Sequence, residues 1–189
     1  MLSISITIQA DDEKIKQVTD FTLNGLLETF SFYSQYSAHF SESKKMDFLE
    51  INLEIEGELI FKKPNYLKRT SEPPYEEIIE IKGDQVTLKR KDKAVKIIDL
   101  KQYPAIESFV AVYRSILSGN HRQLEKHYVV ELSGTQENWR LELKPKNNKL
   151  QQWFTEIILF GQENKINIIE FYDINGDKTL IKLSKHHYV

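Results

Sequence analysis

Apolar and polar residues alternate over short stretches of the chain, which is the spacing of half-buried β-strands. This alternation predicts strands at residues 36–40, 51–61, 79–81, 86–88, 95–98, 128–132, 139–143, 155–160, 166–172 and 179–183. The turns between them are short and polar, and Lys82-Gly83-Asp84-Gln85 favours a hairpin. Gly57 interrupts the second strand and indicates a bulge or a bend of the sheet. Strands of such even spacing are typical of a strongly curled antiparallel meander and not of βαβ units.

Two segments instead show the three- and four-residue spacing of amphipathic helices. The first covers residues 11–31, where the acidic residues 11–13 suit a helix N-terminus. The second covers residues 105–117, between Tyr103-Pro104 and Ser118-Gly119-Asn120. Two helices are a thin cover for the concave face of about ten strands, so they either fill it or form a lid over a cavity. Such a cavity is a common site for a small apolar ligand.

Composition narrows the class of protein. The 189 residues suffice for one full domain, which we expect over residues 11–185. The net charge is −2 with both signs interspersed, so we expect no nucleic-acid partner. The chain has no cysteine, which excludes disulfides and thiolate chemistry but suits the cytosol and the periplasm equally. No run approaches the roughly 18 apolar residues that a membrane-spanning helix needs.

The two ends of the chain depart from the main pattern. Residues 1–10 are uncharged, with apolar residues alternating with small polar ones, and Asp11 follows abruptly. Two interpretations stay open for this segment: the remnant of a secretory signal peptide with cleavage after Ala10, or a short edge strand. At the other end, we expect residues 186–189 to form an unstructured tail.

Patterns that carry catalysis or bind metals are missing from the sequence. There is no GxSxG, HExxH or CxxC motif and no phosphate-cradling glycine loop. The five histidines suit solvated surface positions, and Asp173 and Asp177 surround Asn175-Gly176 without the spacing of an EF-hand. We therefore expect no enzymatic activity, no catalytic residues, no metal and no cofactor.

One segment resembles a known family. Residues 57–65 read Gly-Glu-Leu-Ile-Phe-Lys-Lys-Pro-Asn, preceded by Ser37-Ala38-His39-Phe40-Ser41-Glu42 and followed by Glu72-Pro73-Pro74-Tyr75 and the Gly83-Asp84 hairpin. The order and spacing are similar to those of the lipoprotein carrier family LolA. Less specifically, residues 139–146 resemble the family's L-x-P-K strand end, and residues 104–117 stand where the family has its helical lid.

The resemblance implies an α+β, mainly β fold. It consists of a single strongly curled antiparallel sheet of about ten or eleven strands, an incomplete β-barrel, with helices as a lid over an apolar cavity. In the family this cavity shelters acyl chains of lipoproteins in the periplasm, between an inner-membrane releasing ABC transporter and an outer-membrane acceptor. The resemblance thus implies a periplasmic carrier of a lipoprotein or other acylated cargo, and a monomer is the simplest such carrier.

The candidate site residues follow from the same pattern. Those expected to line the cavity or the lid are apolar: Phe40, Leu59, Phe61, Leu67, Ile79, Ile81, Phe109, Tyr113 and Leu141. The resemblance assigns Lys63, the basic residue before Pro64, to lid closure and cargo release. The best-known carriers have arginine there, and lysine lacks its planar fork of donors, so we expect a weaker latch and a divergent carrier. Residues 43–56 also depart from the family's short polar loop.

Three other functions stay open at this point. The same half-barrel serves lipid- or peptide-sensing modules in envelope-stress signalling, although such modules usually carry a second domain. A small barrel enzyme and an interaction protein with a filled core are the others.

Overall fold

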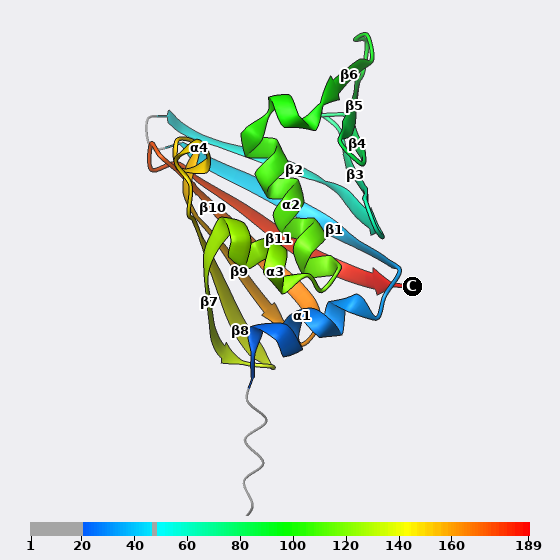
Figure 1. Cartoon of the computed structure of the whole chain (residues 1–189). Coiled ribbons are helices and arrows are strands. Elements are labelled where there is room, and N and C mark those ends of the chain that lie inside the picture. The colour runs from blue at the N-terminus through cyan, green and yellow to red at the C-terminus, as the bar shows by residue number, and fades with distance from the viewer. Residues whose placement is uncertain (1–20, 47–48) are drawn as a thin grey trace, which may run out of the picture.

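The computed structural model describes residues 21–46 and 49–189, and its strands form one antiparallel sheet of eleven strands (Figure 1). In chain order the strands are β1 (Gln35–Met46), β2 (Leu49–Lys62), β3 (Tyr66–Ser71), β4 (Glu77–Lys82), β5 (Gln85–Arg90), β6 (Lys96–Asp99), β7 (Tyr128–Thr135), β8 (Asn138–Pro145), β9 (Phe154–Gln162), β10 (Lys165–Asp173) and β11 (Lys178–Tyr188).

Most neighbours in the sheet are also neighbours in the chain. The order is β6-β5-β4-β3-β2-β1-β11-β10-β9-β8-β7, so the first and last strands pair in the middle of the sheet. Strands β6 and β7 are the two edges and, in the part of the chain that is described, do not pair with each other. The sheet is therefore not closed into a barrel. The prediction of an α+β, mainly β fold with one curled antiparallel sheet of ten or eleven strands is confirmed.

The connection between the two edge strands carries helices over one face of the sheet (Figure 1). It contains the 3₁₀ helix η1 (Leu100–Gln102), α2 (Pro104–Leu117) and α3 (His121–His127). Pro104 is the first residue of α2, where its fixed φ suits a helix start and its missing N–H costs nothing. The predicted second helix is confirmed. We call α2 the lid helix.

Two further helices flank this connection. Helix α1 (Leu23–Ser31) precedes β1, and the one-turn helix α4 (Asn148–Gln151) joins β8 to β9. Thr22 is the N-cap of α1, and its Oγ1 accepts a hydrogen bond of 3.1 Å from the Gly25 N–H. Within the described part of the chain, the predicted first helix is confirmed over residues 23–31, whereas residues 21 and 22 are not helical. Residues 11–20 of that prediction, and the alternatives for residues 1–10, lie outside the described residues.

The inner face of the sheet and the helices share one apolar core. Leu27 of α1, Ile116 of α2 and Leu124 of α3 are buried in the same cluster as the strand residues Phe61 and Leu141. Each large apolar side chain so buried contributes about 1.5–3 kcal/mol. The helices are thus held on the sheet mainly by their apolar faces, with few polar contacts needed to place them.

Strand β3 was not among the predicted strands. Its inner face carries Leu67, Arg69 and Ser71, because alternate residues of a strand face the same side. Only one of these three is apolar, so the alternation that marks the other strands is absent. The structure also corrects the bulge considered at Gly57, because Gly57 pairs with Phe40 of β1 without a shift of register and with Ser71 at the end of β3. The bend of the sheet considered there stays a prediction.

The expected tail at residues 186–189 is wrong. Residues up to Tyr188 belong to β11, and Tyr188 pairs with Tyr36 of β1. The Val189 carbonyl accepts a hydrogen bond of 2.7 Å from the Ser34 N–H. The aromatic rings of Tyr36 and Tyr188 lie 5.2 Å apart, and the Tyr36 hydroxyl is 3.0 Å from Nδ1 of His186. The two polar histidines, 186 and 187, suggested a tail, but they belong to a strand that the neighbouring aromatic contact of Tyr188 with Tyr36 anchors to the sheet.

Candidate functional site

A cavity of about 420 Å³ lies between the lid helix and the sheet, within the size range of sites for small apolar ligands. We call it the acyl cavity, from the guest proposed below. Its apolar lining comes from β1 to β4, from β9 to β11 and from α2: Phe40, Leu59, Leu67, Ile79, Ile81, Ile106, Phe109, Val110, Tyr113, Phe154, Phe171 and Ile181, with Trp153 just before β9.

The structure brings together seven of the nine apolar residues selected from the sequence. Around the acyl cavity lie Phe40, Leu59, Leu67, Ile79, Ile81, Phe109 and Tyr113. Phe61 and Leu141 do not border it, since they are packed in the core with 1% and 0% of their surface exposed. A core residue and a lining residue face the same side of a strand, so alternation alone does not separate them. The ligand-binding role of the seven stays a prediction.

Two residues that border the acyl cavity are exposed to solvent, and neither was among the predicted site residues. Ile106 at the start of the lid helix is 40% exposed, and Trp153 is 49% exposed. Deeper in the cavity, the Phe109 ring lies 4.8 Å from Tyr113 and 4.9 Å from Phe171 of β10. The lid helix therefore meets the sheet here through the aromatic contact of Phe109 with Phe171, which needs no directional hydrogen bond and can adapt to a flexible guest.

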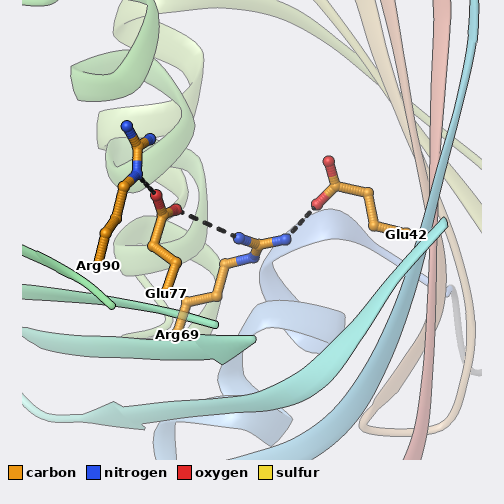
Figure 2. A network of polar contacts seen from close by, with 4 residues as sticks. All are labelled: Glu42, Arg69, Glu77 and Arg90. Carbon is orange, nitrogen blue, oxygen red and sulfur yellow. Dashed lines mark hydrogen bonds and ion pairs between the residues drawn. The ribbon is translucent and has the colours of Figure 1, made fainter. Parts of the chain in front are cut away.

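One end of the acyl cavity is charged. On β1 the inner face runs from Phe40 to Glu42 and Lys44, and on β3 it runs from Leu67 to Arg69. The Arg69 guanidinium lies 4.4 Å from the centre of the Phe40 ring and donates a hydrogen bond of 2.7 Å to Glu42. The same guanidinium joins a line of charges across the strands (Figure 2).

On the other side of this end, Asp173 and Asp177 border the acyl cavity from β10 and the turn that follows it. Lys44 lies 3.8 Å from Asp177, and Asp173 accepts hydrogen bonds from the N–H groups of Asn175 and Asp177. The expected turn at Asn175-Gly176 is confirmed. Deep in the acyl cavity, burial raises the pKa of the Tyr113 hydroxyl, and the nearby Glu42 raises it further, so the phenol stays neutral.

Lys63 is placed at a helix end, but not at the lid helix. Its ammonium donates hydrogen bonds to the carbonyls of Ser31, at 2.5 Å, and Phe30, at 3.4 Å, at the C-terminus of α1. A cation there is favourable because the helix dipole leaves partial negative charge on the last carbonyls. Partial burial lowers the pKa of this amine. Any part of Lys63 in lid release stays a prediction.

The Tyr128 hydroxyl of β7 donates a long hydrogen bond of 3.5 Å to the Ser108 carbonyl of the lid helix. Further polar contacts between the lid helix and the sheet come from Arg114, which the sequence analysis missed. Its guanidinium donates hydrogen bonds to the carbonyl of Asn65, at 3.2 Å, and to that of Gly83. These carbonyls lie in the β2–β3 and β4–β5 turns. Burial lowers the pKa of Arg114, and its Nε has no hydrogen-bond partner among the described residues. The sequence did show a basic residue in the last turn of a predicted helix. Its hydrogen-bond partners could not be predicted, because they lie far away in sequence.

Metal-binding geometry and membrane-spanning helices were also sought in the structure. Within residues 21–46 and 49–189, no group of three or more His, Asp or Glu side chains has the arrangement to hold a metal ion. Among the same residues, no helix has the length and apolar character needed to cross a membrane.

Comparisons with known proteins place this fold in a family. A family model described as outer membrane lipoprotein carrier protein LolA-like matches residues 18–185. A search of curated protein sequences gave no match.

Solved structures with similarity to the chain include a LolA superfamily protein from Nitrosomonas europaea, with 11% identity and a TM-score of 0.45 over 87% of this chain and 92% of that one. An outer membrane lipoprotein-sorting protein domain from Vibrio parahaemolyticus has 12% identity and a TM-score of 0.44, over 88% and 93%. Because the family model spans most of its length, the chain belongs to the outer membrane lipoprotein carrier protein LolA-like family.

Proposed function

We propose that this protein is a carrier that shelters an acyl chain of a lipoprotein or a related lipid in the acyl cavity. The observation that supports this most is the lining of the cavity, which is apolar on the lid side and over most of the sheet side, with the charged residues gathered at one end. Sheltering each methylene group from water is worth roughly 0.8 kcal/mol, so one chain of ordinary length supplies enough energy for transit through water.

Release requires that the hold be reversible. The lid helix rests on the sheet through the contact of Phe109 with Phe171, among other apolar contacts, and through the hydrogen bonds of Arg114 to two turns. Few polar contacts need to break for the lid helix to move, and lids of this kind open on fast timescales. The proposed cycle consists of binding and release, with no catalytic residue, metal or cofactor.

The setting follows from the family. We propose that the carrier works in the periplasm, takes its cargo from an inner-membrane releasing ABC transporter and gives it to an outer-membrane acceptor. A monomer suffices for this role, since the acyl cavity is built from a single chain.

Mass spectrometry of the protein purified gently from its native envelope tests this function. We expect a bound acylated molecule in native spectra, extractable with organic solvent, and its replacement when a palmitoyl lipid is added. A protein that is empty and stays empty in the presence of acyl lipids would rule out the carrier role.

A further inference from the structure

A second pocket of about 430 Å³ adjoins the acyl cavity, and its lining is mostly charged and polar where that of the acyl cavity is mostly apolar. It is bordered by Ile55, Arg69, Ser71, Pro74, Tyr75, Glu76, Glu77, Arg90, Lys91 and Lys93. Arg69 borders both spaces, so the two meet at this side chain. A ligand whose chain lies in the acyl cavity would reach this pocket with the end that passes Arg69. We call it the head-group pocket, from the proposal below.

The sheet itself produces this change of character. On β3 the inner-face series runs Leu67, Arg69, Ser71, and on β4 it runs Ile81, Ile79, Glu77. Strand register places Ser71 opposite Glu77, and Glu77 opposite Arg90 of β5. The inner face thus passes from apolar to polar within two neighbouring cross-strand rows, at Arg69 on β3 and at Glu77 on β4, beside the charged end of the acyl cavity.

A line of alternating charges, Glu42, Arg69, Glu77 and Arg90, runs across β1, β3, β4 and β5 near these rows (Figure 2). Glu42 pairs with Arg69 at 2.7 Å, Arg69 lies 4.0 Å from Glu77, and Glu77 accepts a hydrogen bond from Arg90. These ion pairs hold both guanidinium groups in place around the pocket. Because each guanidinium has five N–H donors, each keeps further donors for a ligand.

The head-group pocket has an excess of positive charge. Four cations border it, Arg69, Arg90, Lys91 and Lys93, against the carboxylates of Glu76 and Glu77. Glu42 also pairs with Arg69 from the charged end of the acyl cavity, so four cations meet three carboxylates and the group has a net charge of +1. Lys91 is paired with Glu76 at 3.3 Å. Lys93 has no ion pair among the described residues. An anion would therefore find one cation here, Lys93, that the protein's own carboxylates do not neutralise.

A buried hydroxyl points to the same conclusion independently. Ser71 borders the head-group pocket with only 5% of its surface exposed, and its Oγ has no hydrogen-bond partner in the described part of the chain. A buried hydroxyl without a partner costs free energy, and a ligand oxygen that accepted its hydrogen bond would remove this cost. Ser71 is a donor for an acceptor oxygen that enters from the pocket.

We propose that this pocket binds the anionic head group of the same amphiphile whose acyl chain occupies the acyl cavity. Phosphate or carboxylate oxygens would accept charge-assisted hydrogen bonds from Arg69 and Arg90 and one from Ser71, and Lys93 would add attraction. This inference rests on the proposed function, because it presumes a chain in the acyl cavity. It narrows the cargo to single amphiphiles with a negative head next to the chain.

Calorimetric titration with probes that share one palmitoyl chain tests the proposal, below the concentrations at which they form micelles. The probes are lysophosphatidic acid with an anionic head, lysophosphatidylcholine with a zwitterionic head and monopalmitoylglycerol with a neutral head. We expect the anionic probe to bind about tenfold tighter than the neutral one, which is the effect of one charged hydrogen bond. The Arg90→Gln, Lys93→Gln and Ser71→Ala variants should each reduce this preference and leave the affinity for the neutral probe unchanged.

Lys89→Gln is the matched control, because Lys89 neighbours Arg90 on the opposite face of β5 and carries the same charge. It should keep the preference. Equal affinities for all three heads, or a preference that survives the three pocket substitutions, would overturn the head-group proposal while leaving the carrier function intact. Inorganic phosphate alone should not compete at millimolar concentration, and competition as strong as that of the lipid would show a free-anion site instead. Failure of every probe, the neutral one included, would instead contradict the carrier function.

Discussion

Arg114 of the lid helix donates a hydrogen bond to the carbonyl of Gly83, at the tip of the β4–β5 hairpin. A second hydrogen bond, of 3.2 Å, reaches the Asn65 carbonyl in the β2–β3 turn. The residue thereby ties the lid helix to the side of the sheet that also carries the cavity residues Leu67, Ile79 and Ile81. Opening of the lid over this side of the acyl cavity must break both bonds.

Arg114→Gln should therefore loosen the lid helix. Hydrogen bonds from a charged group contribute about 1.5–3 kcal/mol each, so we expect amide exchange in residues 104–117 to become about tenfold faster or more. Bound acyl lipid should also dissociate faster. Arg122→Gln, which removes the same charge from an exposed position of α3, should have neither effect. Unchanged exchange in Arg114→Gln would show that the apolar contacts alone hold the lid.

Lys63→Gln distinguishes two roles of Lys63: release of the lid helix, which the family suggests, and capping of the C-terminus of α1, which the structure shows. The ammonium caps the carbonyls of Phe30 and Ser31, so its loss should weaken α1 by about 0.3–1 kcal/mol. We expect faster amide exchange in residues 23–31 and little change in residues 104–117. The opposite pattern, with the lid helix affected and α1 unaffected, would favour a latch on the lid.

Gly57→Ala should destabilise the sheet. A Cβ at this position would lie 1.9 Å from the Thr70 carbonyl oxygen on the neighbouring strand, so the backbone must shift. Overpacking of this kind typically costs about 1–3 kcal/mol, which urea denaturation measures as a lower midpoint. Gly25→Ala, where the nearest atom is Oγ1 of Thr22 at 3.3 Å, should change stability much less. Equal midpoints for wild type and Gly57→Ala would show that the strands separate easily.

Acid should destabilise the protein through Glu142. Hydrogen bonds from Lys144, with Glu156 and Arg140 adding to them, hold the pKa of Glu142 at about 2, below its ordinary 4.5. The folded pKa is the lower one, so the contribution of Glu142 is complete above pH 4.5 and is lost as the pH falls toward about 2. Glu156 acts in the opposite sense, because burial and the neighbouring Glu142 raise its pKa.

Urea midpoints across this pH range measure the effect. Glu142→Gln should flatten the pH dependence, whereas Glu137→Gln, at an exposed position between β7 and β8, should retain it. A Glu142→Gln profile as steep as that of wild type would assign the acid sensitivity to other carboxylates.

The architecture could be predicted largely from local patterns. Alternation located most strands, and the apolar spacing after Pro104 located the lid helix, because both features depend on residues close together in sequence. Strand β3 was not predicted, because Arg69 and Ser71 occupy inner-face positions where the alternation pattern requires apolar residues. The terminal strand was predicted at residues 179–183 but its end was missed, because His186 and His187 resemble a solvated tail until Tyr188 meets Tyr36 of β1.

The site was only partly predictable, for a different reason. Seven apolar residues were found to border the acyl cavity, but nothing local distinguishes Leu59, which lines it, from Phe61, which fills the core two positions later. Arg114 and Ser71 could not be recognised because their significance depends on strand turns and cross-strand neighbours. Such relationships arise only when the register of the sheet is known.

The central claim is that the space under the lid helix holds an acyl chain, and filling that space tests it directly. Ile79→Trp introduces a bulky ring on the cavity side of β4, whereas Ile78→Trp introduces the same ring on the opposite face of the strand. Palmitoyl lipid binding by calorimetry, on variants with thermal stabilities matched to wild type, compares the two. We predict that Ile79→Trp weakens binding more than tenfold and that Ile78→Trp binds like the wild type. Undiminished binding by Ile79→Trp would contradict the claim.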